Sequence, residues 1–267
     1  MDATVRGVAA GSRPPFLRVS GLCVRFGGVN ALDGVSFEVG PRSVCGVIGP
    51  NGAGKTTLFN CLSRLYQPSA GEIHFKGTPI LGKPVHAMAA LGIGRTFQNL
   101  ALFPGMSVLD NVMVGAHSRT RTGFLRAACR TPFVRQEEAA TRGRCLQLLH
   151  TYGLAPLAER PVAELPFGTR KRVELARAMA AQPELLLLDE PAAGLNHEEV
   201  DRLRETILAI RDQGTSVLLV EHHMNLVMRC SDHVIAIDFG RKIADGTPET
   251  VQCDPQVVAA YLGQAAA

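Results

Sequence analysis

One short segment constrains this chain more than any other: residues 49–56 read GPNGAGKT and match the pattern G-x-x-x-x-G-K-[ST]. A continuous apolar run, residues 43–48, precedes the segment, and a stretch of helical character, residues 55–66, follows it. Glycines allow successive backbone N–H groups to curl around an anion, and the start of a helix adds a favourable partial charge. A tight turn alone does not require Lys-Thr after its last glycine. The segment therefore predicts a strand, a phosphate-binding loop and a helix in succession.

The residues of this loop are expected to divide the work of holding a phosphate chain. Lys55 is expected to reach the β- and γ-phosphates of a nucleotide, and the Thr56 hydroxyl is expected to bind Mg²⁺. The residues expected to contact the nucleotide are Gly49, Pro50, Asn51, Gly52, Ala53, Gly54, Lys55, Thr56 and Thr57. The motif predicts nucleotide binding without choosing the activity, because kinases, GTPases, helicases and transport ATPases share it.

The hydrophobic pattern around the loop predicts an α/β fold. Apolar runs at 43–48, 185–190, 216–221 and 233–238 alternate with helical patterns, which favours a mostly parallel core sheet covered on both faces. Short β-like runs between residues 16 and 39 predict an antiparallel β edge layer. From about 99 to 181 helical periodicity replaces the strand pattern, so we expect an inserted helical subdomain there. We expect one domain over 16–262, a flexible N-terminal tail over 1–15 and a short tail over 263–267.

Composition excludes several classes of protein. The net charge of 28 basic minus 24 acidic residues, +4, is too small to indicate a nucleic-acid-binding protein. The surplus is local: residues 118–145 hold seven arginines and two glutamates, a net +5. The seven cysteines are scattered and never spaced C-x-x-C, which argues against a zinc site or a disulfide framework. The sequence shows neither an apolar run long enough to span a bilayer nor a secretory signal at its start.

Two acidic residues close the apolar run LLLLDE at 185–190. Asp189, at the expected carboxyl end of a strand, can hold Mg²⁺ through water, and Glu190 can polarise an attacking water as general base. An isolated Asp-Glu pair at a strand end can also be merely solvated. Its coexistence with a phosphate loop favours the catalytic interpretation.

A further motif flanks the acidic pair. Leu165-Pro-Phe-Gly-Thr169 opens a helical stretch, Gly168 stands 21 positions before Asp189, and PAAGLNHEE follows from residue 191. In these features the chain resembles the ATP-binding-cassette family over about residues 16–260. The family has an LSGGQ-like signature turn before the Asp-Glu strand and a D-loop after it, which match residues 165–169 and 192–196.

The resemblance implies roles for three more residues. Phe26 falls where an aromatic ring stacks on adenine, and Gln98 matches a glutamine that senses Mg²⁺ and the attacking water. His222 matches a histidine that contacts the γ-phosphate. Taken singly, Phe26 could be a core residue, Gln98 a surface residue and His222 a strand-end histidine. The expected catalytic residues are Glu190, His222, Lys55 and Gln98. The expected Mg²⁺ ligands are Thr56, Gln98 and Asp189. The further nucleotide contacts are expected from Phe26, Gln98, His222, Leu165, Gly168 and Thr169.

The resemblance also implies how such a protein works. It implies an ATPase that sandwiches ATP and Mg²⁺ between two cassettes, as a homodimer or heterodimer. It further implies membrane permease subunits, an indirect role for a periplasmic or extracellular substrate-binding protein, no nucleic-acid partner, and a peripheral location on the cytoplasmic face of the cell membrane. One residue departs from the family pattern: Pro166 occupies the signature serine position and offers neither a hydroxyl nor an N–H. We therefore expect a weakened signature turn and a partner cassette with a stronger one.

Within the family, three features resemble the ATP-binding subunit of branched-chain amino acid importers: the opening FGGV-x-AL-x-GVSF from residue 26, the long helical insertion near 115–145, and PAAGLNHEE. The alternatives are a cassette for another substrate, such as a urea or amide importer or a lipid exporter, and a cassette acting on nucleic acid or the ribosome. Small-molecule kinases with a phosphate loop would lack the signature turn and the histidine at 222.

Overall fold

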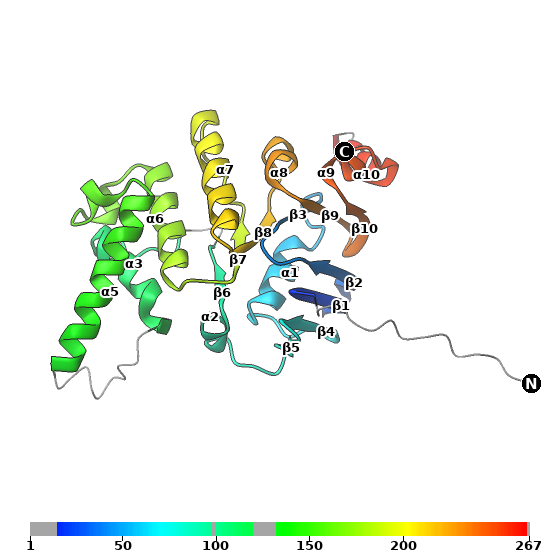
Figure 1. Cartoon of the computed structure of the whole chain (residues 1–267). Helices are drawn as coiled ribbons and strands as arrows, with labels where there is room; N and C mark the ends of the chain where they lie inside the picture. The colour runs from blue at the N-terminus through cyan, green and yellow to red at the C-terminus, as the bar shows by residue number, and fades with distance from the viewer. Residues whose placement is uncertain (1–14, 98–99, 120–131, 266–267) are drawn as a thin grey trace, which may run out of the picture.

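The structure is a computed structural model that describes residues 15–97, 100–119 and 132–265, with side chains described as far as residue 262. Its strands form two sheets (Figure 1). The first is a four-stranded antiparallel sheet in the order β2-β1-β4-β5. Its strands are β1 (Leu17–Phe26), β2 (Val29–Val39), β4 (Ala70–Phe75) and β5 (Thr78–Pro79). The expected antiparallel layer is therefore present, and it gains two strands from beyond residue 39.

The second sheet has six strands in the order β10-β9-β3-β8-β7-β6. Five of them are parallel, and β10 joins the edge antiparallel to β9. They are β3 (Val44–Ile48), β6 (Ile93–Arg95), β7 (Leu185–Asp189), β8 (Ser216–Val220), β9 (His233–Asp238) and β10 (Arg241–Gly246). Every residue of β3, β7 and β8 is buried, as strands covered on both faces require. The predicted α/β fold with a mostly parallel core sheet is confirmed.

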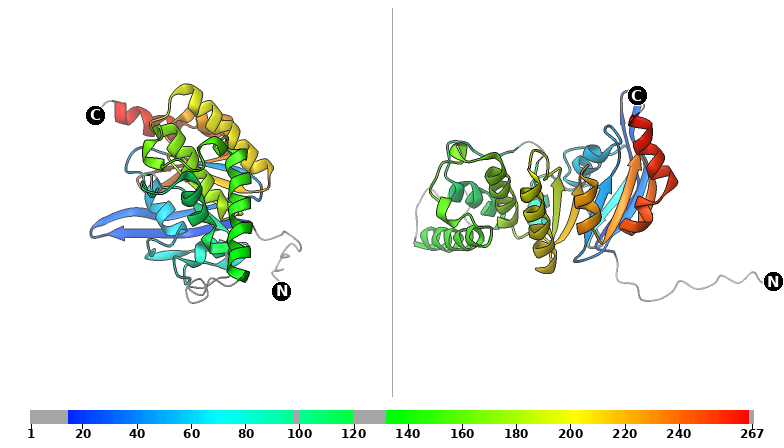
Figure 2. Two further views of the ribbon diagram at one scale, coloured as in Figure 1. Left: turned by 90° about the vertical axis from the view of Figure 1, so that its left-hand side faces the viewer. Right: turned by 90° about the horizontal axis from the view of Figure 1, so that it is seen from above.

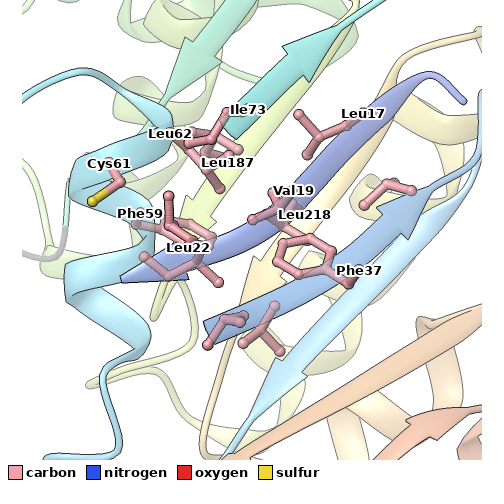
Figure 3. Packing of buried hydrophobic residues seen from close by; sticks show 14 of the residues in the cluster. Leu17, Val19, Leu22, Phe37, Phe59, Cys61, Leu62, Ile73, Leu187 and Leu218 are labelled. Atoms are coloured by element: carbon pink, nitrogen blue, oxygen red, sulfur yellow. The ribbon is translucent and has the colours of Figure 1, made fainter. Parts of the chain in front are cut away.

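Alternate side chains of the core strands enter two hydrophobic clusters. Leu185 and Leu187 of β7 face a cluster shared with α1 (Lys55–Leu62) and the antiparallel sheet, part of which Figure 3 shows. Leu186 and Leu188 face the opposite cluster, which includes residues of α7 (His197–Asp212) and α8 (Met224–Cys230). The period of two along a strand thus places helices on both sides of the sheet. The remaining helices beside the sheets are α2 (Ala87–Leu91), α9 (Pro248–Gln252) and α10 (Pro255–Ala265).

The helices between residues 100 and 181 form a separate lobe at one side of the sheets (Figures 1 and 2). Those that the structure describes are α3 (Val108–Gly115), η1 (Ala116–Arg119), α5 (Pro132–Thr151), η2 (Ala155–Leu157), η3 (Val162–Glu164) and α6 (Phe167–Ala180). They pack around a third hydrophobic cluster of their own, which includes Leu109, Leu149 and Val173. The only bridge outside the named strands in the described ranges joins Ser107 to Pro161. The helical character predicted for this region is present, and the domain limits given above remain a prediction.

Two local differences from the sequence predictions have physical causes. Helix α1 ends at Leu62 and not at Tyr66, because Arg64 adopts a left-handed backbone conformation (φ 64°) that a helix cannot continue through. The Arg-rich segment is described only in part, since residues 120–131 lie outside the described ranges. None of the helices described by the structure combines the length and the apolar character needed to cross a bilayer.

Candidate active site

The phosphate loop, residues 49–56, begins directly after β3 and ends within the first turn of α1. Gly49, Gly52 and Gly54 have positive φ values of 152°, 80° and 106°. Space is limited as well: a Cβ on Gly49 would lie 2.0 Å from the Ile237 carbonyl oxygen, and one on Gly54 would lie 2.4 Å from that of Ala31. Both glycines are therefore required by backbone conformation and by close packing, independently of any ligand.

Lys55 lies inside the loop. Its side chain is buried, and Nζ donates to the carbonyl oxygens of Gly49, at 2.7 Å, and Pro50, at 2.9 Å. Burial lowers the pKa of the Lys55 ammonium, while the charges of Glu190 and Asp189 act in the opposite direction. The lysine therefore shares one electrostatic environment with both acidic residues predicted for the site, although they stand more than 130 positions away in the sequence.

The order of the core strands explains this convergence. Strand β3 pairs with β8, and β8 pairs with β7, all in parallel. The segments that follow them, the phosphate loop, Glu190 and His222, therefore leave the same edge of the sheet. This carboxyl edge is where open α/β sheets bind ligands.

Asp189 is almost fully buried at the end of β7. Its Oδ2 forms an ion pair with Arg95 at 2.9 Å, and its Oδ1 is buried with no hydrogen-bond partner among the described residues. Burial raises the pKa of the Asp189 carboxyl above its ordinary value, and the hydrogen bond and charge of Arg95 oppose this shift. A carboxylate with one oxygen held by arginine and the other lacking a protein donor fits a Mg²⁺ ion held through water.

Glu190 occupies a left-handed backbone conformation with φ of 46°, which is strained for a residue with a side chain. Three contacts hold it there. The Glu190 N–H donates to the Val220 carbonyl at 2.9 Å, and the Glu190 carbonyl accepts from the Ala193 N–H at 3.2 Å and from Lys171 Nζ at 3.3 Å. Lys171 belongs to α6, so a residue of the helical lobe touches the turn that carries the predicted general base.

The other predicted contacts lie around this edge. Phe26 is half exposed at the end of β1, and its ring meets that of Tyr66 edge-on at 5.3 Å. His222 is exposed just after β8, with its ring beside that of His223. Thr56 is exposed and Thr57 is half-buried, both in the first turn of α1. Gln98 lies outside the described residues.

The signature turn, residues 165–169, packs against the start of α7 in the same chain. Leu165 is buried, Pro166 is the N-cap of α6 without a side-chain cap bond, and Thr169 is half-buried in the first turn. A Cβ on Gly168 would lie 2.1 Å from Oε1 of Glu199. Glu199 and Asn196 form the capping box that opens α7. The turn therefore packs against the start of the helix that follows the D-loop.

Several residues around the site were not predicted from the sequence. Arg95 donates to Asp189, Asn60 and Ser63, so it ties β6 and α1 to the acidic strand. The Tyr261 hydroxyl accepts the Gly49 N–H at 2.8 Å. Lys171 and Glu221 also contact the loops of the site. Glu221 is next to His222 in the sequence. Neither its charge nor this position indicates that its carboxylate is buried.

A cavity of about 440 Å³ lies between α6 and α7. Its lining includes Gly168, Thr169 and Asp189, but no residue of the phosphate loop. The cavity is therefore distinct from the place where the loop would hold phosphates, and it marks the junction between the helical lobe and the core.

Comparison with known proteins agrees with this geometry. A family model described as "ABC transporter" matches residues 32–193, and one described as "Branched-chain amino acid ATP-binding cassette transporter" matches residues 241–267. The high-affinity branched-chain amino acid transport ATP-binding protein BraF of Pseudomonas aeruginosa is 45% identical over 94% of this chain and 99% of its own. Its counterpart LivG of Escherichia coli is 42% identical over the same shares.

Solved structures give the same result. An ATP-binding cassette of an ABC transporter in its ADP conformation has a TM-score of 0.82 and 30% identity, covering 93% of this chain and 99% of that one. A nucleotide-free cassette has a TM-score of 0.81 and 29% identity, with coverage of 92% and 98%. The phosphate loop, the acidic strand end and these likenesses over nearly the whole chain lead to one conclusion: the chain belongs to the ABC transporter family, as one of its ATP-binding cassettes.

Proposed function

We propose that this ATP-binding cassette, an ATPase by family, powers the uptake of branched-chain or related amino acids through a separate membrane permease. The proposed substrate class is supported by the 42–45% identity, over 94% of the chain, to proteins named for branched-chain amino acid transport. A family model described as "Branched-chain amino acid ATP-binding cassette transporter" matches residues 241–267 and supports the same substrate class.

In the proposed hydrolytic site the residues share the tasks of holding the nucleotide and directing its hydrolysis. The backbone N–H groups of the loop and Lys55 hold the β- and γ-phosphates, Glu190 directs the attacking water, and His222 and Gln98 contact the reacting end. Thr56, Gln98 and Asp189 would hold Mg²⁺, which when bound neutralises charge on the phosphate oxygens. The buried Oδ1 of Asp189 without a described partner supports its assignment.

A second cassette is expected to complete the site. The signature turn, residues 165–169, would contact the γ-phosphate held by the opposite subunit. In this chain Gly168 and Thr169 retain an N–H and a hydroxyl, but the N-cap is Pro166 and no side chain caps α6. We infer that the partner cassette bears the stronger signature turn and that the two ATP sites of the pair are unequal.

The proposed place of work is the cytoplasmic face of the cell membrane, beside the permease. There the Arg-rich segment, residues 118–145, would face anionic lipid headgroups or acidic permease loops. The Arg119 guanidinium forms hydrogen bonds within the chain instead. It donates to the carbonyl oxygens of Ala181, at 2.7 Å, and Gln182, at 2.9 Å, just after α6. A membrane contact would therefore fall to other arginines, among them Arg121, Arg126 and Arg130, which lie outside the described residues.

Uptake of radiolabelled leucine by cells lacking the gene tests the proposal. The wild-type gene is expected to restore uptake, and Lys55→Ala is expected not to, because the loop then lacks its phosphate-binding ammonium. Glu72→Gln changes an exposed carboxylate on β4, away from the loop, and serves as the control. If the deletion leaves leucine uptake unchanged and instead abolishes uptake of urea or export of a lipid, the proposed substrate is wrong.

A further inference from the structure

Glu221 is a fully buried carboxylate to which the proposed hydrolytic reaction assigns no task. It follows the last residue of β8 and precedes His222. Its Oε1 accepts the Ala192 N–H at 2.6 Å, and its Oε2 accepts the N–H groups of His222, at 3.1 Å, and His223, at 3.3 Å. Three backbone donors thus converge on one side chain, and they come from two different loops.

Each of these loops carries a residue proposed to act on ATP. Ala192 is itself fully buried and lies in the turn that starts at Glu190, where the Ala193 N–H closes on the Glu190 carbonyl. On the other side, the His222 ring has its Nδ1 3.8 Å from Oε2 of Glu221. Ala192 and Glu221 are 29 positions apart in the sequence and meet because β7 and β8 are neighbours.

We propose that Glu221 is a positioning residue that fixes the Glu190 turn and the His222 loop relative to each other. The inference rests on the roles proposed above for Glu190 and His222. Glu190 has a strained φ of 46°, and such a conformation persists only where its surroundings over-determine it. The bond from Ala192 to Oε1 supplies one such restraint, and the two bonds to Oε2 link that restraint to the histidine loop.

The chemistry of the donors requires a carboxylate. An ionised glutamate only accepts hydrogen bonds, so both of its oxygens can serve N–H groups at once. Glutamine has one oxygen and an NH₂ group, which would face an N–H and leave that donor unpaired. Glu221→Gln must therefore release either the Ala192 turn or the His222 loop. Aspartate keeps two accepting oxygens on a side chain shorter by one methylene, so Glu221→Asp is expected to recover part of the effect.

Steady-state ATP hydrolysis by the purified chain, or by the chain with its partner cassette, provides the first readout. Glu221→Gln is expected to lower kcat between about 10- and 100-fold through misplacement of reacting groups, with KM for ATP changed less than about 3-fold. Ser216→Ala is the matched control: Ser216 is also fully buried on β8, at the opposite end, where its hydroxyl accepts the Arg42 N–H at 2.8 Å. Its kcat, corrected for the folded fraction, is expected to stay within about 2-fold.

Amide hydrogen exchange provides a readout independent of turnover. In the folded wild-type chain the Ala192 N–H is expected to exchange slowly. In Glu221→Gln, protection is expected to fall at 190–193 or at 222–223 while β3 and β7 keep theirs. If Glu221→Gln does not fold, the proposal is tested with Glu221→Asp and with the exchange rates of the wild-type chain. A rapidly exchanging Ala192 N–H in the folded wild-type chain overturns the proposal.

The proposal is also overturned if folded Glu221→Gln keeps the kcat of the Ser216→Ala control, or if KM alone changes. A different result is expected if the roles proposed for Glu190 and His222 are themselves wrong. In that case Glu190→Gln would turn over ATP normally, whatever the state of Glu221. Intact turnover in Glu221→Gln together with lost turnover in Glu190→Gln would reject the positioning role alone.

Discussion

At the scale of single residues, two adjacent carboxylates have different environments. Asp189 is buried at the end of β7, and burial raises its pKa while Arg95 opposes the shift. Glu190 is half-buried one position later, where the backbone turns to a φ of 46°. The backbone therefore changes direction between two residues that are adjacent in the sequence. These different environments agree with the different roles proposed for them, Asp189 in holding Mg²⁺ and Glu190 in directing water.

Glu190→Gln tests this division. The variant is expected to retain ATP binding and to lose turnover by about 100-fold or more, because an amide cannot accept the proton of the attacking water. Binding of a fluorescent ATP analogue and phosphate release measure the two quantities. Glu184→Gln is the matched control, since Glu184 is an exposed carboxylate just before β7 that pairs with Lys76. Undiminished turnover in Glu190→Gln would remove Glu190 from this role.

A buried thiol predicts a pH dependence of stability. Cys61 is fully buried on α1, and burial raises the pKa of its thiol to about 11. The folded state therefore keeps this proton at pH values where the unfolded chain has lost it. The stabilising contribution is complete below about pH 9 and is lost as pH rises towards 11, by up to about 1.4 kcal/mol per pH unit.

Urea denaturation at pH 8, 9 and 10 measures this effect as a difference between variants. Cys61→Ala creates a cavity whose cost does not depend on pH, so the gap in unfolding free energy between wild type and variant is expected to narrow above pH 9. Cys253→Ala, at an exposed position, is the control and is expected to keep a constant gap. A constant gap for Cys61→Ala as well would contradict the burial effect on the thiol.

At the scale of secondary-structure elements, the starts of α6 and α7 are interlocked. Helix α7 opens with a capping box between Asn196 and Glu199, whereas α6 opens at Pro166 without a side-chain cap. Gly168, in the first turn of α6, leaves the space that Glu199 occupies. The absence of one side chain on α6 thus allows the cap of α7 to form, which no helical pattern in either segment could predict.

Gly168→Ala is therefore expected to displace Glu199 and cost about 1 kcal/mol of unfolding free energy, the typical worth of a helix cap. A double-mutant cycle measures the coupling: in the Glu199→Ala background the same change is expected to cost almost nothing. Gly143→Ala on α5 is the control, because a Cβ there meets nothing within 4 Å and alanine favours a helix. Additive costs for Gly168→Ala and Glu199→Ala would contradict the interlock.

At the scale of the whole molecule, the sheet and the helical lobe each contribute part of the proposed site. The phosphate loop, Glu190 and His222 leave the carboxyl edge of the six-stranded sheet, and the signature turn starts α6 of the lobe. Lys171 of α6 donates to the Glu190 carbonyl at 3.3 Å, so the lobe and the core meet at the turn that carries the proposed general base. A movement of the lobe would therefore change the hydrogen bond that Lys171 donates to the Glu190 carbonyl.

If Pro166 weakens the signature turn, as proposed above, the chain alone is expected to be a slow ATPase. Mixing it with its partner cassette is expected to raise ATP hydrolysis per site about 10-fold or more, because a stronger turn then donates to the γ-phosphate. Pro166→Ser is expected to raise the rate of the chain alone by restoring a hydroxyl and an N–H. Phosphate release at saturating ATP measures both. Equal rates for the chain alone and for the mixed pair would reject unequal sites.

Much of the core could be predicted locally. Strands β3, β7 and β8 were predicted because continuous apolar runs are the pattern of strands buried on both faces. Strands β5 and β6, of two and three residues, are too short to show a pattern, and they owe their place to pairing with β4 and β7. The end of α1 was missed because a left-handed Arg64 has no signature in residue type.

The phosphate loop, the acidic strand end and the fully buried core strands follow from residue type and spacing within short segments of the chain. Contacts between distant segments depend on the tertiary fold: Arg95 pairs with Asp189, 94 positions away, Glu221 accepts the Ala192 N–H, and Glu199 fills the space beside Gly168. The physical reason is that parallel strands are joined through long crossovers, so the neighbours of each strand end are set by sheet order and not by proximity along the chain.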